Sequence, residues 1–95
     1  MDGLETDMIM LITTPTCAGC KTAKPIYEDF FLAKQQEYSI VDGSVEKDLM
    51  LILNVRSVPT LLFIKDRKVT GRIVGVPDTD KLKTLYKEYL GENDE

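Results

Sequence analysis

Two cysteines separated by two residues are the groups in this sequence with the clearest capacity for chemistry. They form the motif Cys17-Ala18-Gly19-Cys20, and the chain of 95 residues contains no other cysteine and no histidine. Without histidine, Ser-His-Asp and Cys-His nucleophiles and histidine metal sites are excluded. A disulfide scaffold would use more cysteines set farther apart, because the stabilisation in the loop-entropy model grows with the loop closed. The spacing therefore favours reactive thiols.

The predicted elements around the motif place Cys17 at the start of a helix. Residues 8–12 form an apolar run typical of a buried strand, and after the cysteines apolar residues recur every three or four positions, as in an amphipathic helix. Unpaired amides and the positive end of the helix dipole favour a thiolate, so Cys17 is the expected nucleophile. Cys20, one turn further in, should be less exposed and suits the resolving role. Pro25 falls inside this helix and should bend it.

The rest of the chain continues the alternation of short strands and helices. Strand or helix patterns cover residues 38–41, 44–54, 58–64, 69–75 and 77–90. Ser44 is the expected N-cap of the second helix, and Gly91 should end the last one. The order β-α-β-α-β-β-α predicts an α/β fold with a four-stranded mixed sheet flanked by helices.

Size and charge narrow the function classes further. A chain of this length, 43% hydrophobic, suits one domain over residues 1–95, with frayed ends at 1–7 and 92–95. Sixteen acidic against twelve basic residues give a net charge of −4, the wrong sign for a dedicated binder of nucleic acid or of anionic membranes. No apolar run is long enough to span a membrane, and the acidic first residues are unlike a secretory signal. We therefore expect a cytoplasmic protein, and we also expect a monomer.

Several motifs along residues 8–90 resemble the thioredoxin family. They are Thr16-Cys17-Ala18-Gly19-Cys20-Lys21, Pro25, Val58-Pro59-Thr60-Leu61 and Ile73-Val74-Gly75. The resemblance implies that Pro59 is cis and lies against the cysteines, that Val58 offers backbone hydrogen bonds to a substrate, and that Gly75 lets a substrate backbone approach. The residues expected to contact a substrate are Thr16, Ala18, Gly19, Val58, Pro59 and Gly75, and the expected catalytic residues are Cys17 and Cys20.

Two positions depart from the family pattern. Thr16 stands where the family usually has tryptophan, so a flat apolar contact surface is missing. Leu11 stands where the family has a buried aspartate that accepts the proton of the inner thiol. Deprotonation of Cys20 must then rely on water or on a substrate group. Residues 74–78 lack the glycine pair typical of the glutaredoxin glutathione site, so weak glutathione binding is expected.

The motif and the resemblance together predict a thiol-disulfide oxidoreductase that reduces protein disulfides. The Cys17–Cys20 disulfide would be its redox centre, with no other cofactor. Expected partners are proteins that contain disulfides, a thioredoxin-reductase-type flavoprotein as electron donor, and a cytosolic reductase such as ribonucleotide reductase as one candidate recipient.

Three alternatives remain open at this level. The first is a glutaredoxin-like redox protein linked to glutathione. The second is a module that holds zinc or an iron-sulfur cluster between two copies through the same cysteines, because one copy offers only two thiolates and predicts no metal site of its own. The third is an interaction domain with a purely structural disulfide.

Overall fold

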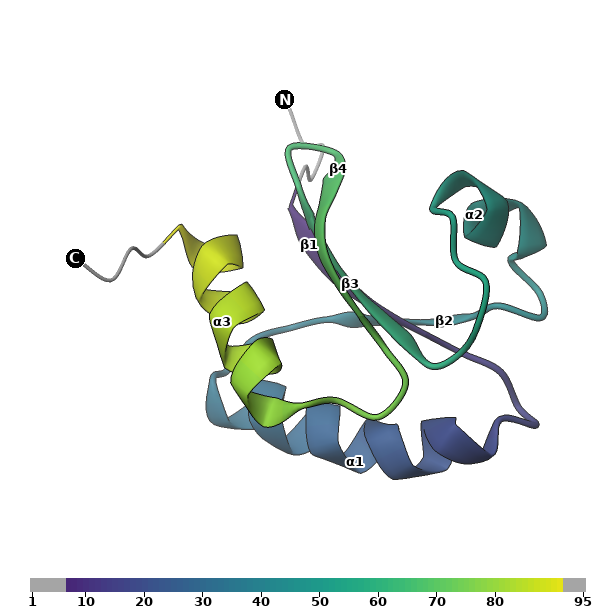
Figure 1. The fold of residues 1–95 in the computed structure, drawn as a ribbon, viewed down its shortest axis with the longest axis horizontal. Helices are drawn as coiled ribbons and strands as arrows, with labels where there is room; N and C mark the ends of the chain where they lie inside the picture. Colours follow the sequence, from purple (N-terminus) through teal and green to yellow (C-terminus); the bar gives the residue numbers. More distant parts are fainter. Residues whose placement is uncertain (1–6, 92–95) are drawn as a thin grey trace.

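A mixed sheet of four strands forms the centre of the structure (Figure 1). The structure is a computed structural model that describes residues 7–91. Its strands are β1 (Met8–Thr13), β2 (Ser39–Asp42), β3 (Thr60–Lys65) and β4 (Lys68–Val74), and its helices are α1 (Ala18–Ala33), α2 (Lys47–Ile52) and α3 (Thr79–Leu90). The element order is β-α-β-α-β-β-α, which confirms the predicted fold class.

The strands are arranged in the order β2-β1-β3-β4. β1 pairs in parallel with β2 and antiparallel with β3, and β3 and β4 form an antiparallel hairpin. In this register Leu11 lies beside Ile40 on one side and beside Leu61 on the other. A register shift interrupts the hairpin between Phe63 and Ile64. The apolar run at residues 8–12 is thus the inner strand that the sequence predicts.

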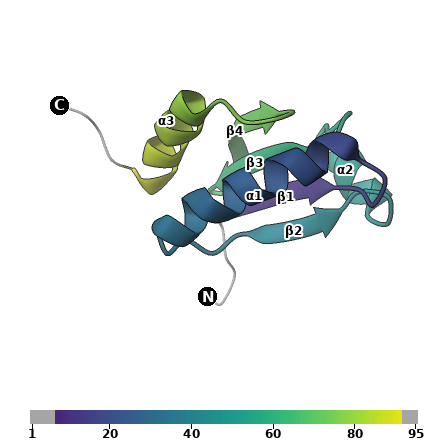
Figure 2. The same cartoon turned by 90° about the horizontal axis from the view of Figure 1, so that it is seen from below.

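Alternate residues of β1 serve the two faces of the sheet, as the period of a strand requires. Ile9 and Leu11 pack with buried residues of α1 and α3, among them Tyr27 and Phe31. Met10 and Ile12 face the other way, against a second cluster that includes side chains of α2. Figure 2 shows α1 over one face of the sheet with α2 on the other side.

The start of α2 differs from the predicted one. Ser44 is not its N-cap, because α2 begins at Lys47 with Glu46 at the cap position and no side-chain cap. The backbone N–H and the hydroxyl of Ser44 instead donate to a carboxylate oxygen of Asp42, at 2.9 and 2.6 Å. Aspartate readily binds the backbone two residues later, and this turn competes with the predicted cap. The two hydrogen bonds lower the pKa of Asp42.

The last helix follows the prediction more closely. Asp78 caps its start by accepting a hydrogen bond from the Asp80 amide at 2.9 Å, and Gly91 ends it with a φ of 79°.

The ends of the strands differ from the predicted ends by one or two residues. Pro25 lies inside α1, as expected. None of the helices within residues 7–91 is long and apolar enough to cross a membrane.

The predicted frayed ends fall mostly on residues 1–6 and 92–95, which lie outside the described part of the chain. Asp7 is described, and its carboxylate accepts a hydrogen bond from the Asp66 amide at 3.1 Å. The first described residue is therefore tied to the turn between β3 and β4.

Candidate active site

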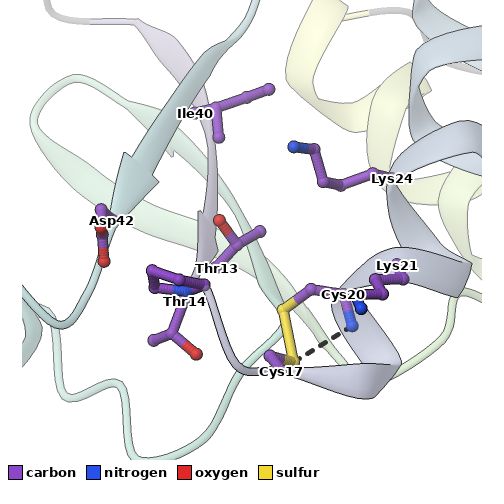
Figure 3. Close-up of a pocket in the computed structure, with 9 residues that line it drawn as sticks. Thr13, Thr14, Cys17, Cys20, Lys21, Lys24, Ile40 and Asp42 are labelled. Atoms are coloured by element: carbon purple, nitrogen blue, oxygen red, sulfur yellow. Dashed lines mark hydrogen bonds between the residues drawn. A yellow bond between two sulfur atoms is a disulfide. The ribbon is translucent and has the colours of Figure 1, made fainter.

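The cysteine motif lies where the chain leaves β1 and enters α1. Cys17 is the N-cap of α1, with extended backbone angles of φ −87° and ψ 112°. Its sulfur accepts a hydrogen bond from the Cys20 amide at 3.1 Å and is joined to the Cys20 sulfur in a disulfide (Figure 3). The two Cα atoms are 5.3 Å apart. The predicted position of Cys17 at the helix start is thus present, and its sulfur meets one of the amides that the first turn leaves unpaired.

The two sulfur-bearing residues differ in exposure. Cys17 is half-buried, whereas Cys20 is only 3% exposed. An incoming nucleophile or disulfide therefore has better access to Cys17, as the sequence predicts.

Pro59 packs beside the motif from the loop that precedes β3. The Val58–Pro59 peptide bond is cis, and Pro59 is buried. A Cβ atom added to Gly19 would lie 3.3 Å from Cδ of Pro59, so the glycine permits close packing of the two segments. The structure thus brings Gly19 and Pro59 together, although they are 40 positions apart in the sequence.

Gly75 joins this group at the end of β4. Its amide donates to the Pro59 carbonyl at 2.8 Å, and its φ of 86° is one that residues other than glycine rarely adopt. Apart from its two chain neighbours, no heavy atom of residues 7–91 lies within 4 Å of the position that its Cβ would occupy, so the space beside it is open. Val58 is half-buried on the same loop as Pro59, while Thr16 and Ala18 are exposed beside Cys17.

Leu11, at the position where the family has a proton-accepting aspartate, lies in apolar surroundings. Leu11 is fully buried in the cluster that contains Ala23 and Tyr27, and it pairs with Ile40 across the strands. The hydroxyl of Tyr27 is buried and has no hydrogen-bond partner within the described residues. Burial raises the pKa of Tyr27, so this hydroxyl stays protonated.

A cavity of about 370 Å³ opens beside the disulfide, on the side of β2 (Figure 3). Its lining consists of Thr13, Thr14, Pro15, Cys17, Cys20, Lys21, Lys24, Ile40 and Asp42. None of Lys21, Lys24 and Asp42 is among the predicted site residues, although Lys21 directly follows the motif. The signal for Lys24 is its spacing, four residues after Cys20 and hence on the same side of the helix.

No three histidine, cysteine, aspartate or glutamate side chains within residues 7–91 are grouped so that they could hold a metal ion.

The model of the family described as Thioredoxin matches residues 3–88. The chain belongs to the thioredoxin family. Among curated relatives, mitochondrial thioredoxin of Mus musculus is 32% identical over 90 residues, covering 92% of this chain and 54% of that protein. Thioredoxin of Borreliella burgdorferi is 34% identical over 79 residues, covering 79% of this chain and 66% of that protein. The chain thus spans between about half and two thirds of the length of these two relatives.

Solved thioredoxin structures share the fold. A mutant thioredoxin from Halobacterium salinarum aligns with a TM-score of 0.77 and 25% identity, over 90% of this chain and 75% of that one. Thioredoxin f from spinach chloroplast aligns with a TM-score of 0.74 and 28% identity, over 90% of this chain and 78% of that one. These similarities confirm the resemblance on which the expected roles of Pro59 and Gly75 depend.

Proposed function

We propose that this thioredoxin-family protein reduces disulfides of other proteins by dithiol-disulfide exchange. The observation that carries the proposal is the unequal exposure of the two cysteines beside Pro59, with Cys17 accessible and Cys20 at 3% exposure. In the reduced protein, the Cys17 thiolate attacks one sulfur of the substrate disulfide. The substrate S–S bond breaks, a mixed disulfide forms at Cys17, and the second substrate sulfur leaves as a thiolate that takes up a proton.

The second step closes the cycle. Cys20, as a thiolate, attacks the Cys17 sulfur of the mixed disulfide, and the remaining substrate sulfur leaves and is protonated. The products are the Cys17–Cys20 disulfide and a substrate dithiol, so two electrons have passed to the substrate. The protein needs no further cofactor for this exchange, since both reacting groups are its own side chains.

The surface around Cys17 is where the substrate chain would bind. The half-buried Val58 and the open space at Gly75 support backbone contacts on one side of the disulfide. Exposed Thr16 and Ala18 add only small side chains, so a bulky substrate segment can come close. Gly19 serves mainly to let Pro59 pack against the motif.

A thioredoxin-reductase-type flavoprotein is the proposed electron donor. Support comes from a relative named NADPH-dependent thioredoxin reductase 3 from Arabidopsis thaliana, which is 27% identical over 88 residues. The match covers 90% of this chain and 16% of that protein. Ribonucleotide reductase as a recipient, the monomeric state and the cytoplasmic location stay predictions from the sequence.

Serine variants of the two cysteines test the proposal. We expect Cys17→Ser to lose reduction of a model disulfide protein such as insulin, because the nucleophile is gone. Cys20→Ser should instead accumulate a mixed disulfide at Cys17, detectable by mass, because the resolving thiol is missing. Full activity of Cys17→Ser would show that the nucleophile is wrongly assigned. Measuring reduction of the wild-type disulfide by a thioredoxin reductase and by glutathione would then identify the donor.

A further inference from the structure

The cavity beside the disulfide carries two positive charges that the exchange reaction does not use. Lys21 and Lys24 line it together with both cysteines. Both lysines are exposed on α1, and Figure 3 shows Lys24 extending from the helix across the cavity toward β2. Within residues 7–91 the side chain of neither lysine makes an ion pair or a hydrogen bond. Their charges are therefore available to a ligand, in a chain whose net charge is −4.

The opposite wall of the cavity is of a different kind. Asp42 stands at the end of β2, and its carboxylate is occupied by the two hydrogen bonds from Ser44. Ile40, 51% exposed, adds an apolar side chain to the same wall, two residues before Asp42 on β2, and Thr13 and Thr14 line the cavity at the end of β1 and just after it. A negatively charged group in the cavity is thus attracted to the α1 wall and repelled from the end of β2. The cavity thus has a cationic wall on α1, an opposite wall with an apolar side chain and an aspartate on β2, and room for a side chain with its flanking backbone.

We propose that this cavity receives an acidic side chain, aspartate or glutamate, of the protein whose disulfide is reduced. The inference rests on the proposed function and adds a substrate class to it. Because Cys17 and Cys20 themselves line the cavity, the acidic residue must lie within a few residues of the substrate cysteine that bonds to Cys17. Charge complementarity of this kind raises the association rate and selects partners.

Three peptides with one disulfide each test the inference. They differ only in a glutamate, a glutamine or a lysine two residues from the cysteine that is attacked. The quantity compared is kcat/KM for the reduced full chain, divided by the rate constant of the same peptide with dithiothreitol, which removes the effect of the charge on the disulfide itself. We expect the glutamate peptide to be favoured about fivefold over the glutamine peptide at low salt, and the lysine peptide to be disfavoured. The preference should shrink at high salt.

A charge reversal with a matched control locates the effect. Lys24→Glu should abolish the preference for the glutamate peptide and favour the lysine peptide. Lys68→Glu changes the net charge equally. Lys68 is exposed and is the first residue of β4, at the opposite end of the strand from Gly75, so this variant should keep the wild-type preference. If the substitution also changes the reactivity of the cysteines, the normalised kcat/KM values of all three peptides change by the same factor. The ratio between the peptides therefore still reports the charge preference.

The outcomes separate the inference from the proposed function. Equal normalised rates for the three peptides, or a glutamate preference that persists in Lys24→Glu, would overturn the acidic-residue site while leaving disulfide reduction in place. If the reduced wild-type chain reduces none of the peptides, the proposed function itself fails, and the substrate class fails with it.

Discussion

The hydroxyl of Tyr27 is a buried polar group without a hydrogen bond in the described part of the chain, and it should lower the stability of this protein. It is buried among apolar residues and has no partner within residues 7–91, whereas the hydroxyl of Tyr86 donates to Gln36 at 3.1 Å. We predict that Tyr27→Phe stabilises the protein by about 1 kcal/mol, because it removes a buried polar group that makes no hydrogen bond. Urea unfolding should show a higher midpoint at an unchanged slope.

Tyr86→Phe is the matched control for this prediction. It removes a hydroxyl that has a partner, so it should lower stability by about 1 kcal/mol. A loss of stability in Tyr27→Phe would mean that the hydroxyl is solvated or hydrogen-bonded in solution.

Asp42 gives the protein a pH dependence with a defined direction. Its hydrogen bonds with Ser44 lower its pKa below the ordinary value for aspartate, so the folded state binds the proton less well than the unfolded state. The resulting stabilisation is present above the unfolded pKa and is lost as the pH falls through the lower, folded pKa.

We predict that Ser44→Ala is less stable than wild type at pH 7, and that this difference in the free energy of unfolding becomes smaller in acid as Asp42 is protonated. Urea titrations of both proteins at neutral and at acidic pH check this. A difference that stays constant would assign the effect to the hydroxyl alone.

Among the elements, α2 contacts the sheet through partly buried side chains and through an arginine at its end. None of its residues is buried, and Leu51 is 80% exposed. Arg72 of β4 donates to the carbonyls of Leu53 and Asn54, both at 3.0 Å, at the end of the helix. A cation at this end also interacts favourably with the helix dipole.

We therefore predict that Arg72→Met lowers stability by about 1–2 kcal/mol, because two charge-assisted hydrogen bonds are lost while the aliphatic stem is kept. Thermal or urea unfolding measures this. Arg67→Met, at the exposed turn of the hairpin, should change stability little. Equal effects in the two variants would show that the contacts of Arg72 with α2 contribute nothing.

Elements are predictable from the sequence where one local signal dominates. The apolar run of β1, the Asp78 and Gly91 caps of α3 and the position of Cys17 at a helix start all follow from nearby residues. The start of α2 does not, because two local hydrogen-bonding patterns compete there and the Asp42 turn prevails over the Ser44 cap.

On the scale of the whole molecule, the site depends on contacts that local sequence patterns do not contain. The cis bond at Pro59 and the role of Gly75 follow from the family resemblance, and the structure brings both residues to the cysteine motif. The cavity is absent from the predictions. It exists because the parallel pairing of β1 with β2 places Ile40 and Asp42 opposite α1, and such a pairing cannot be recognised from either strand alone.

The irregularity between Phe63 and Ile64 gives the hairpin two separately registered halves. On the site side, four pairs run from Phe63 with Gly71 to Thr60 with Val74, next to the bond between Gly75 and Pro59. On the far side, only two pairs precede the turn. A bulge accommodates an extra residue in one strand, and loop tips tolerate insertions. Residues added at that turn should therefore leave the strand pairing next to the cysteine motif unchanged. The hairpin tip is thus a place to insert a reporter or an affinity tag while the disulfide surface keeps its geometry.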